Sequence, residues 1–528
     1  MKHTPSLRIL YITFIPCLST YLPAIASVKV GNAQLSTTSP KPSFAHSRLI
    51  AHYSQLKATF PRHNWDIINY KSLIINKLTN IKKFLKKWDI CNLKTKTLKN
   101  DKVNIITLGC SKNMVDSEML GGQLNANGID VTHENRKLDH NIVVVNTCGF
   151  IDKAKEESVN TILEQVALKR SGKLDKVYVT GCLSERYRHD LLKEIPEVDA
   201  WFGTLELPLI LKQFNADYKA ELVGERMLST PKHYAYLKIS EGCNRTCSFC
   251  AIPLMRGGHV SKTIEEVVSE AKGLVKKGVK EIMLIAQELT YYGLDIYKKR
   301  MLPDLLKHLS DIEGLTWIRL HYAYPSKFPL DILDVMRERD NICNYLDMPL
   351  QHISNNMLTA MKRQISREEI TDLIANVRDR VPGICIRTTL IAGFPGETRD
   401  DVEDLKQFLT DTRLDRVGIF TYSHEENTTA HDLIDNVPAE EKEARAQEIM
   451  EVQQEISFEK NQEKIGNTYK VIIDKKEAGR YLARTEFDSV EVDNEVVIES
   501  KKALPIGDFV TVKITKAFDY DLEGEVVI

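Results

Sequence analysis

The sequence predicts an α/β protein with three folded parts: an N-terminal parallel α/β sheet, a central partial barrel of the TIM type, and a small C-terminal β-barrel. Three observations lead to this prediction. Short apolar runs alternate with helical patterns over residues 101–230, six further strand–helix units occupy residues 231–462, and residues 463–528 change to short β segments separated by turns. Alternating strands and helices are typical of parallel sheets, whereas short, closely spaced strands are typical of small barrels. A chain of 528 residues is long enough for three or four domains.

Residues 1–100 form a basic extension before these parts. They carry 16 Lys and Arg but only two Asp and Glu, although the net charge of the whole chain is −1. An apolar stretch at residues 9–27, preceded by Lys2 and Arg8, is similar to a secretory signal, and the basic remainder is similar to an organelle transit peptide. A third interpretation is a start assigned too early, with Leu93 as the candidate true start. We favour an extension that is disordered or wrongly assigned, and prolines in the apolar stretch argue against a membrane span.

The first folded part is predicted to contain three parallel strands that each end beside a glycine and a cysteine. The expected strands are residues 103–108, 142–146 and 176–180. The expected helices are residues 115–127 and 153–169. Ligands of open α/β sheets collect at the carboxyl ends of the strands, so Cys110, Cys148 and Cys182 should share one edge. A lone cysteine after a strand is usually core, but three in the same position suggest an iron–sulfur cluster with one open iron. The neighbouring glycines would let the backbone approach it closely.

The most specific motif is Cys243-Asn-Arg-Thr-Cys247-Ser-Phe249-Cys250, which follows the first predicted strand of the central part. Structural zinc sites usually have four ligands and two-residue gaps, and the nearest further candidate, His259, lies nine residues after Cys250. Ten cysteines in 528 residues do not make a disulfide scaffold. Three thiolates would leave one iron of a 4Fe–4S cluster open to a small molecule, with zinc as the alternative.

The central part is predicted to place its site at the carboxyl ends of six strands. The expected strands are residues 235–240, 281–286, 317–321, 345–350, 384–392 and 416–422. Gln287 follows the second strand and Gly393 follows the fifth, so both are candidates for ligand binding, although Gly393 could serve only a turn. Residues 439–462 are charged and helical and are interpreted as a linker helix. The C-terminal barrel strands are expected at residues 469–473, 481–484, 495–498, 509–517 and 522–528.

The cysteine spacing, with an aromatic residue before the last cysteine, resembles the radical S-adenosylmethionine (SAM) enzymes. This resemblance implies that the central cluster binds SAM through its open iron. It further implies cofactor contacts at Phe249, Gln287, Arg387 and Gly393. Phe249 would form an apolar wall, and Arg387 would pair with the methionine carboxylate, because arginine suits bidentate carboxylate binding.

Residues 101–528 resemble one branch of these enzymes, the methylthiotransferases. Leu-Gly-Cys110-Ser-Lys-Asn, Asn-Thr-Cys148-Gly-Phe and Thr-Gly-Cys182-Leu are similar to that family's N-terminal domain. The resemblance implies a second, auxiliary 4Fe–4S cluster on these three cysteines and a C-terminal TRAM module of the OB type. It also implies two SAM molecules per turnover, one as radical source and one as methyl donor. A sulfide source and an electron donor are then required, and no side chain is assigned as a catalytic residue.

Methylthiotransferases act on a transfer RNA adenosine or on a protein aspartate, and charge helps to choose between them. Residues 464–528 hold 10 Lys and Arg and 13 Asp and Glu, whereas a nucleic-acid barrel needs a positive groove. An acidic barrel suits a basic ribosomal protein. The segment from Arg484 to Asp493 resembles the branch that modifies an aspartate of small-subunit ribosomal protein twelve, although Val490 stands where that branch would have proline.

The sequence therefore predicts methylthiolation of the β-carbon of that aspartate. The TRAM module is expected to dock the substrate, and the enzyme is expected to be monomeric, cytoplasmic and without a membrane span. A transfer RNA methylthiotransferase and a non-catalytic metal-binding module that docks on the ribosome are the alternatives.

Overall fold

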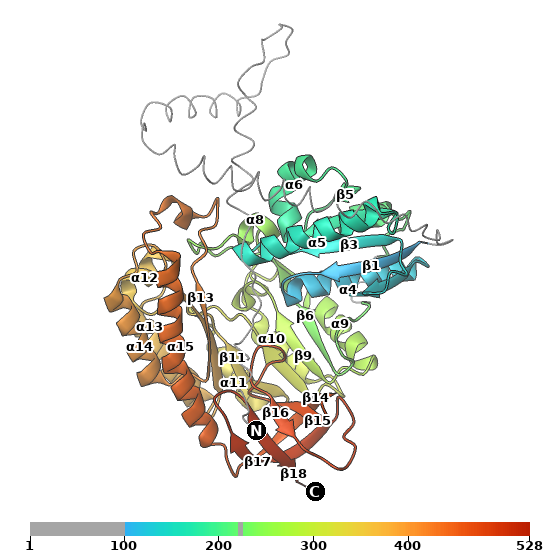
Figure 1. Ribbon diagram of the computed structural model, residues 1–528. Helices are drawn as coiled ribbons and strands as arrows, with labels where there is room; N and C mark the ends of the chain where they lie inside the picture. The colour runs from blue at the N-terminus through green and yellow to red at the C-terminus, as the bar shows by residue number, and fades with distance from the viewer. Residues whose placement is uncertain (1–100, 220–224, 528) are drawn as a thin grey trace, which may run out of the picture.

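The computed structural model describes residues 101–219 and 225–527. The predictions for the N-terminal extension lie outside the described residues. The described chain forms a five-stranded sheet, a six-stranded sheet and a closed five-stranded barrel, which confirms the predicted fold class. Figure 1 shows the first sheet above the central one and the barrel below it. None of the helices in the described ranges is both long and apolar enough to cross a membrane.

The N-terminal sheet is entirely parallel, in the order β2-β1-β3-β4-β5. Its strands are β1 Lys102–Thr107, β2 Asp130–His133, β3 Ile142–Thr147, β4 Lys176–Gly181 and β5 Ala200–Trp201. The helices are α4 Ser111–Ala126, α5 Asp152–Arg170, α6 Cys182–Glu194 and α7 Leu207–Lys212. Both faces of β3 are buried in separate apolar clusters, as expected for a parallel sheet covered on both sides. The sequence prediction missed β2 and β5, which are short strands at the two edges.

The central sheet is also parallel and takes its strands in chain order, from β6 to β13. These are β6 Tyr234–Lys238, β9 Glu281–Ile285, β10 Trp317–Leu320, β11 Ile342–Asp347, β12 Cys385–Ala392 and β13 Arg416–Thr421. Its covering helices are α9 Ile264–Lys276, α10 Leu302–Ser310, α11 Asp331–Glu338, α13 Arg367–Arg380, α14 Arg399–Thr412 and α15 Ala439–Gln462. Since β6 and β13 do not pair, the sheet is an open barrel, with its largest apolar core between the strands and these helices.

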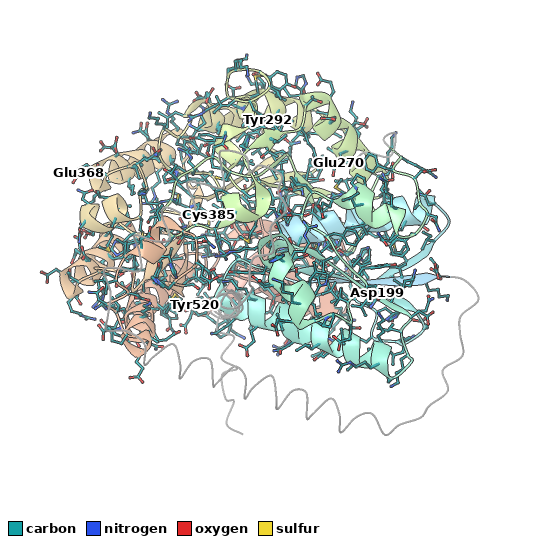
Figure 2. The ribbon with its side chains drawn as sticks, turned by 90° about the horizontal axis from the view of Figure 1, so that it is seen from above. Asp199, Glu270, Tyr292, Glu368, Cys385 and Tyr520 are labelled. Carbon is teal, nitrogen blue, oxygen red and sulfur yellow. The ribbon has the colours of Figure 1, made fainter. Side chains whose placement is uncertain are left out.

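Short elements connect the central strands. They are β7 Ser240–Glu241, α8 Ile252–Arg256, β8 Val260–Ser261, η2 Leu289–Tyr291, α12 Asn355–Ala360 and η3 Thr429–Asp432. Seen from above (Figure 2), Asp199 beside β5 and Glu368 of α13 lie at opposite sides of the molecule, and Cys385 of β12 lies between them.

Helix α15 has the predicted bounds, but the prediction that it is a linker is wrong. It packs against β12, β13 and α14, and therefore belongs to the helical layer of the central barrel. Ile449 and Ile456 are buried in the central core. Gln453 donates a hydrogen bond from Nε2 to the carbonyl oxygen of Leu414 at 3.0 Å. The charged composition was misleading because most of the charged residues lie on the exposed side of a helix whose other side is buried.

The C-terminal barrel closes through five strands in the order β14-β15-β16-β18-β17. They are β14 Thr468–Glu477, β15 Arg480–Thr485, β16 Val496–Ile498, β17 Phe509–Ala517 and β18 Leu522–Val526. Alternate residues of these strands fill a small separate core.

The C-terminal barrel is attached to the amino ends of the central strands. Glu281, the first residue of β9, pairs with Arg484 of β15 at 2.7 Å. Arg416, the first residue of β13, pairs with Asp488 at 2.6 Å. The ring of Trp317, the first residue of β10, lies 4.8 Å from that of Phe509. Charged pairs and an aromatic contact thus fix the barrel at the end of the sheet opposite to the cysteine motif.

The loop between β15 and β16 extends from the amino ends of the central strands into the open barrel. Ser489 of this loop hydrogen-bonds the His321 ring at 3.0 Å, and Asp493 accepts a hydrogen bond from the Tyr345 hydroxyl at 2.7 Å. Asp493 also pairs with Arg387 at 3.3 Å, and Asp347 pairs with the same guanidinium at 3.1 Å. The loop therefore links four central strands to the C-terminal barrel.

We expect the ion pair between Arg416 and Asp488 to stabilise this attachment strongly. Both side chains are buried, with 7% and 1% of their surfaces exposed. Asp488→Asn would leave a buried guanidinium without its carboxylate, so the free energy of unfolding should fall by about 3–5 kcal/mol. Urea unfolding followed by tryptophan fluorescence measures this, because Trp317 lies in the interface.

Glu448→Gln is the matched control. Glu448 pairs with Arg399 at 2.7 Å, but these side chains are 33% and 49% exposed, so its loss should cost less than about 1 kcal/mol. Equal losses in the two variants would contradict a stabilising role for the buried pair.

Candidate metal centre and active site

The three strand-end cysteines of the N-terminal sheet lie at one edge. β1, β3 and β4 are neighbours in the sheet, and Cys110, Cys148 and Cys182 follow their carboxyl ends directly. Burial raises the pKa of the Cys148 thiol, and the nearby Cys182 and Cys110 raise it further. The three thiols are therefore close enough to interact, although they are far apart in the sequence. We call them the auxiliary triad.

The backbone around the auxiliary triad leaves space that a side chain would fill. Gly109 has a φ of +89°, and a Cβ atom there would lie 2.7 Å from the Cys148 sulfur. Only glycine adopts this conformation readily and leaves the sulfur unobstructed. The residues present therefore fit a bulky group held by three thiolates, such as a 4Fe–4S cluster.

Asn113 holds this edge together from the first turn of α4. Its Nδ2 donates hydrogen bonds to the carbonyl oxygens of Leu108 at 2.8 Å and Thr147 at 3.0 Å. The Cys182 thiol donates to its Oδ1 at 3.7 Å. Asn113 thus joins the ends of β1 and β3 to the third cysteine.

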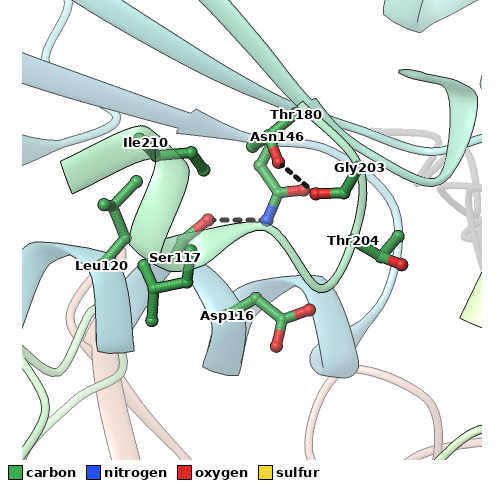
Figure 3. Close-up of a pocket in the computed structure, with 10 residues that line it drawn as sticks. Asp116, Ser117, Leu120, Asn146, Thr180, Gly203, Thr204 and Ile210 are labelled. Atoms are coloured by element: carbon green, nitrogen blue, oxygen red, sulfur yellow. Dashed lines mark hydrogen bonds between the residues drawn. The ribbon is translucent and has the colours of Figure 1, made fainter. Parts of the chain in front are cut away.

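A small pocket lies between α4 and the ends of β3 and β4 (Figure 3). Asn146 donates a hydrogen bond to the Ser117 hydroxyl at 2.9 Å, and Thr180 donates to the carbonyl oxygen of Gly203 at 3.1 Å. These bonds tie its walls together. Gly181, the residue before Cys182, also lines this pocket, so the pocket lies next to that cysteine.

The central cysteines lie in the loop between β7 and α8, at the carboxyl end of β6. Gly242 has a φ of +73°, and a Cβ atom there would lie 2.6 Å from the carbonyl oxygen of Gly257. That oxygen accepts a hydrogen bond from the Cys243 amide at 3.1 Å, and Cys250 donates its amide to the carbonyl oxygen of Cys247 at 3.2 Å. The tight loop brings the three cysteines together. We call Cys243, Cys247 and Cys250 the central triad.

Burial disfavours free thiolates in the central triad. It raises the pKa of Cys243 to about 11 and that of Cys250 to about 12. A cationic metal group would supply the charge that buried thiolates need, because a coordinated thiol is deprotonated. The donor set therefore fits a metal-bound state.

Two further side chains contact the Cys247 sulfur. Arg363 donates from Nη1 to the sulfur at 3.1 Å, and the Tyr324 hydroxyl lies 3.5 Å from it. The Arg245 guanidinium lies between two aromatic rings, 4.0 Å from Tyr291 and 3.8 Å from Tyr324. No local pattern connects Arg363 and Tyr324 to the cysteine motif, so the sequence did not predict these two contacts.

The edges that carry the two triads meet at the interface between the N-terminal sheet and the central barrel. Cys182 packs in one buried apolar cluster with Ala251 and Met255, and Ala251 directly follows Cys250. In Figure 1, α8 lies beside α6 at this interface. The interface thus brings the edges that carry the two triads into contact.

Buried charges connect the same two edges. Arg256 of α8 donates to Asn113 and pairs with Asp116 of α4 at 2.6 Å. Lys238 of β6 also pairs with Asp116, and with Glu241 at 2.5 Å. This network holds the auxiliary triad against the loop of the central triad.

Within residues 101–219 and 225–527, no group of three or more His, Cys, Asp or Glu side chains is arranged to hold one metal ion. A 4Fe–4S cluster needs a wider arrangement than a single ion does, because its thiolates bind different irons.

Two of the four expected cofactor contacts lie at the carboxyl ends of the strands. Phe249 packs against a buried cluster that includes Phe394 and Tyr422, next to the ends of β12 and β13. Gln287 follows β9 and donates to Glu241 at 2.6 Å. Its Oε1 is buried without a hydrogen-bond partner among the described residues. Both residues remain predicted cofactor contacts.

The other two predicted cofactor contacts, Arg387 and Gly393, each have a neighbour from elsewhere in the chain. Arg387 pairs with Asp347 and Asp493, so two internal carboxylates already neutralise its charge and direct it toward the C-terminal barrel. Its contact with a cofactor carboxylate stays a prediction. A Cβ atom at Gly393 would lie 2.8 Å from that of Lys442, so packing against α15 explains this glycine.

Family models match three consecutive parts of the chain. The model described as uncharacterized protein family UPF0004 matches residues 102–203, that of the radical SAM superfamily matches residues 237–409, and that of the TRAM domain matches residues 465–527. Among solved structures, the radical SAM methyltransferase TsrM of Kitasatospora setae has a TM-score of 0.46. It is 15% identical and covers 61% of this chain and 73% of its own, which is too distant to inform the site.

Relatives with much higher identity span most of the chain. Ribosomal protein uS12 methylthiotransferase RimO of Cytophaga hutchinsonii is 60% identical over 436 residues, which are 82% of this chain and 100% of the relative. RimO of Flavobacterium psychrophilum is 60% identical over 434 residues, with the same coverage. RimO of Bacteroides thetaiotaomicron is 53% identical over 432 residues, which are 81% of this chain and 99% of the relative. Because these relatives are matched along their whole length, the chain belongs to the uS12 methylthiotransferase family of radical SAM enzymes.

Proposed function

We propose that this protein replaces a hydrogen on the β-carbon of an aspartate in ribosomal protein uS12 by a methylthio group, and that it does so in the cytoplasm. The single observation that carries this proposal is that the edges carrying the two cysteine triads lie in one buried interface. The contact between Cys182 and Ala251 joins them. A reaction that needs both a radical and a sulfur atom requires two such groups close to one substrate carbon. The names of the relatives support uS12 as the substrate.

The two triads would hold one 4Fe–4S cluster each. Cys243, Cys247 and Cys250 would hold the cluster that binds SAM, with Phe249 and Gln287 as cofactor contacts. Cys110, Cys148 and Cys182 would hold the auxiliary cluster. When bound, the clusters and two SAM molecules supply the one-electron cleavage of the cofactor, the removal of the hydrogen, and the sulfur and methyl groups.

The chain itself supplies position and exclusion of water. Arg363 donates to the Cys247 sulfur and the Tyr324 hydroxyl lies beside it, so that both side chains fix its orientation. The network of Asp116 and Arg256 holds the two triads at one interface. Burial around them excludes water, which protects a reactive carbon centre from side reactions.

The C-terminal barrel is proposed to dock the substrate. Its acidic composition suits a basic ribosomal protein better than transfer RNA. We further propose a monomeric enzyme that takes electrons from an electron donor and sulfur from a sulfide source.

A direct assay tests the proposed function. The full chain, reconstituted anaerobically with iron and sulfide, receives a reductant and SAM together with either uS12 or transfer RNA. Mass spectrometry should show a methylthio mass gain on one aspartate of uS12 and none on the RNA. A gain on RNA alone would overturn the choice of substrate, and cleavage of SAM without any gain would show that uS12 is not the substrate.

Cys247→Ala should abolish reductive cleavage of SAM, because it removes one of three ligands of the central cluster. The measurement is formation of 5′-deoxyadenosine after addition of a reductant. Cleavage at the rate of the unaltered protein would show that the central triad does not hold the SAM-binding cluster.

Cys148→Ala should leave cleavage of SAM intact but stop methylthio insertion. The iron content should fall by about half, because one of two four-iron clusters is lost. Cys343→Ala is the matched control, since Cys343 is buried beside Trp317 outside both triads and should keep all the iron. Continued insertion by Cys148→Ala would contradict the role of the auxiliary triad.

A further inference from the structure

Lys112 is a buried cation that pairs with no carboxylate of residues 101–219 and 225–527. Only 8% of its surface is exposed. Its Nζ lies 3.1 Å from the centre of the Tyr322 ring. In the part of the chain that the structure describes, no Asp or Glu lies within ion-pairing distance of this ammonium. The nearby interface cations differ, because Lys238 and Arg256 each pair with Asp116.

This position is unfavourable for a lysine that serves structure alone. A buried ammonium loses its hydration, and attraction to an aromatic face compensates for that loss only in part. Lys112 is also the second residue of α4, where the positive end of the helix dipole opposes a cation. An anion bound beside Nζ would remove both penalties.

The Tyr322 ring is held under Lys112 by a strained backbone. Tyr322 has a φ of +63°, which is rare for a large side chain and typical of functional positions. Its amide donates to Asp347 at 3.2 Å, and its carbonyl oxygen accepts from the Leu289 amide at 3.1 Å. These bonds keep the ring at the carboxyl end of β10.

Lys112 lies where the substrate carbon of the proposed reaction must come. It is two residues after Cys110 of the auxiliary triad, and its ammonium lies over the carboxyl end of β10. Gln287 follows the neighbouring strand β9, and its Oε1 is buried and unpaired among the described residues. The unpaired cation and this polar group therefore belong to the same end of the sheet as the central triad.

We propose that Lys112 binds the side-chain carboxylate of the substrate aspartate. This inference rests on the proposed function. The β-carbon of aspartate is bonded directly to the carboxylate carbon, so a lysine that binds the carboxylate also fixes the carbon to be modified. Lys112 then explains selection of an acidic side chain, which an adenosine does not offer. The methionine carboxylate of SAM has the same chemistry, and the experiment separates these two sources.

The test compares the reconstituted full chain with Lys112→Met, which keeps the length of the side chain but removes its charge. Three quantities are measured: kcat and KM for methylthiolation of uS12, binding of labelled uS12, and cleavage of SAM in the absence of uS12. Binding is measured for uS12 with its target aspartate and for the same protein with asparagine there. Iron content and the electron paramagnetic resonance spectra of both clusters show whether the site is intact.

We expect kcat/KM for uS12 to fall by about ten- to a hundredfold in Lys112→Met, as for loss of a buried charge-assisted hydrogen bond. Cleavage of SAM without uS12 and the iron content should not change. Replacing the target aspartate by asparagine should weaken binding to the unaltered enzyme but not to Lys112→Met, since the two changes remove the same interaction. Lys112→Arg should recover part of the loss.

Lys176→Met is the matched control. Lys176 also lies over a tyrosine ring, at 6.0 Å from that of Tyr178, but at the amino end of β4. It should behave like the unaltered enzyme.

Two outcomes would overturn the inference. Equal loss of binding for the aspartate and asparagine forms in Lys112→Met would show that Lys112 does not read the carboxylate. Loss of SAM cleavage in the absence of uS12 would assign Lys112 to the cofactor. Failure of the proposed function is distinguishable, because the unaltered enzyme would then not modify uS12 at all.

Discussion

The interface between the N-terminal sheet and the central barrel is the constraint on which the rest of the structure depends. Each cysteine triad is formed locally, by strand ends in one sheet and by a tight loop in the other. The proposed reaction needs both triads close to one substrate carbon, so the two edges must be held together. Asp116 provides this connection, since it pairs with both Lys238 and Arg256 of the central barrel. Buried charges that are paired in this way are costly to separate, so the interface has a fixed register.

This constraint explains why several residues at the edges that carry the triads have positive φ angles. Gly109 and Gly242 adopt positive φ values beside the two triads, and Tyr322 and Gln351 do so at the ends of β10 and after β11. Strain of this kind persists only where the surrounding structure determines it. Here the sheets supply that surrounding structure, and the strained residues lie where the strands end. The site therefore consists mainly of strand ends and short loops on a rigid framework.

Local patterns made much of this fold and site predictable. The three strands that end at cysteines, the six strand–helix units and the bounds of α15 follow from short-range signals. The role of α15 did not, because the burial of Gln453 depends on strands that are distant in the sequence. Arg363 and Tyr324 reach Cys247 from 116 and 77 residues away, so no spacing could indicate them. The pair of Arg387 and Asp493 was unforeseen for a similar reason, since Asp493 comes from a barrel whose docking the sequence does not show.

The attachment of the C-terminal barrel has a geometric consequence. Its buried pairs, such as Arg484 with Glu281, fix it to the amino ends of strands whose opposite ends carry the central triad. The barrel is therefore a rigid landmark at a set separation from the reacting edge, and not an arm that swings toward it. The β15–β16 loop enters the central barrel, where Val490 packs in one cluster with Ile285 and Val115. A partner held on the outer surface of the small barrel must instead span the height of the central sheet with its own structure. With the docking proposed above, the distance from the surface of the C-terminal barrel to the carboxyl ends of the central strands would determine which residue of the substrate is modified.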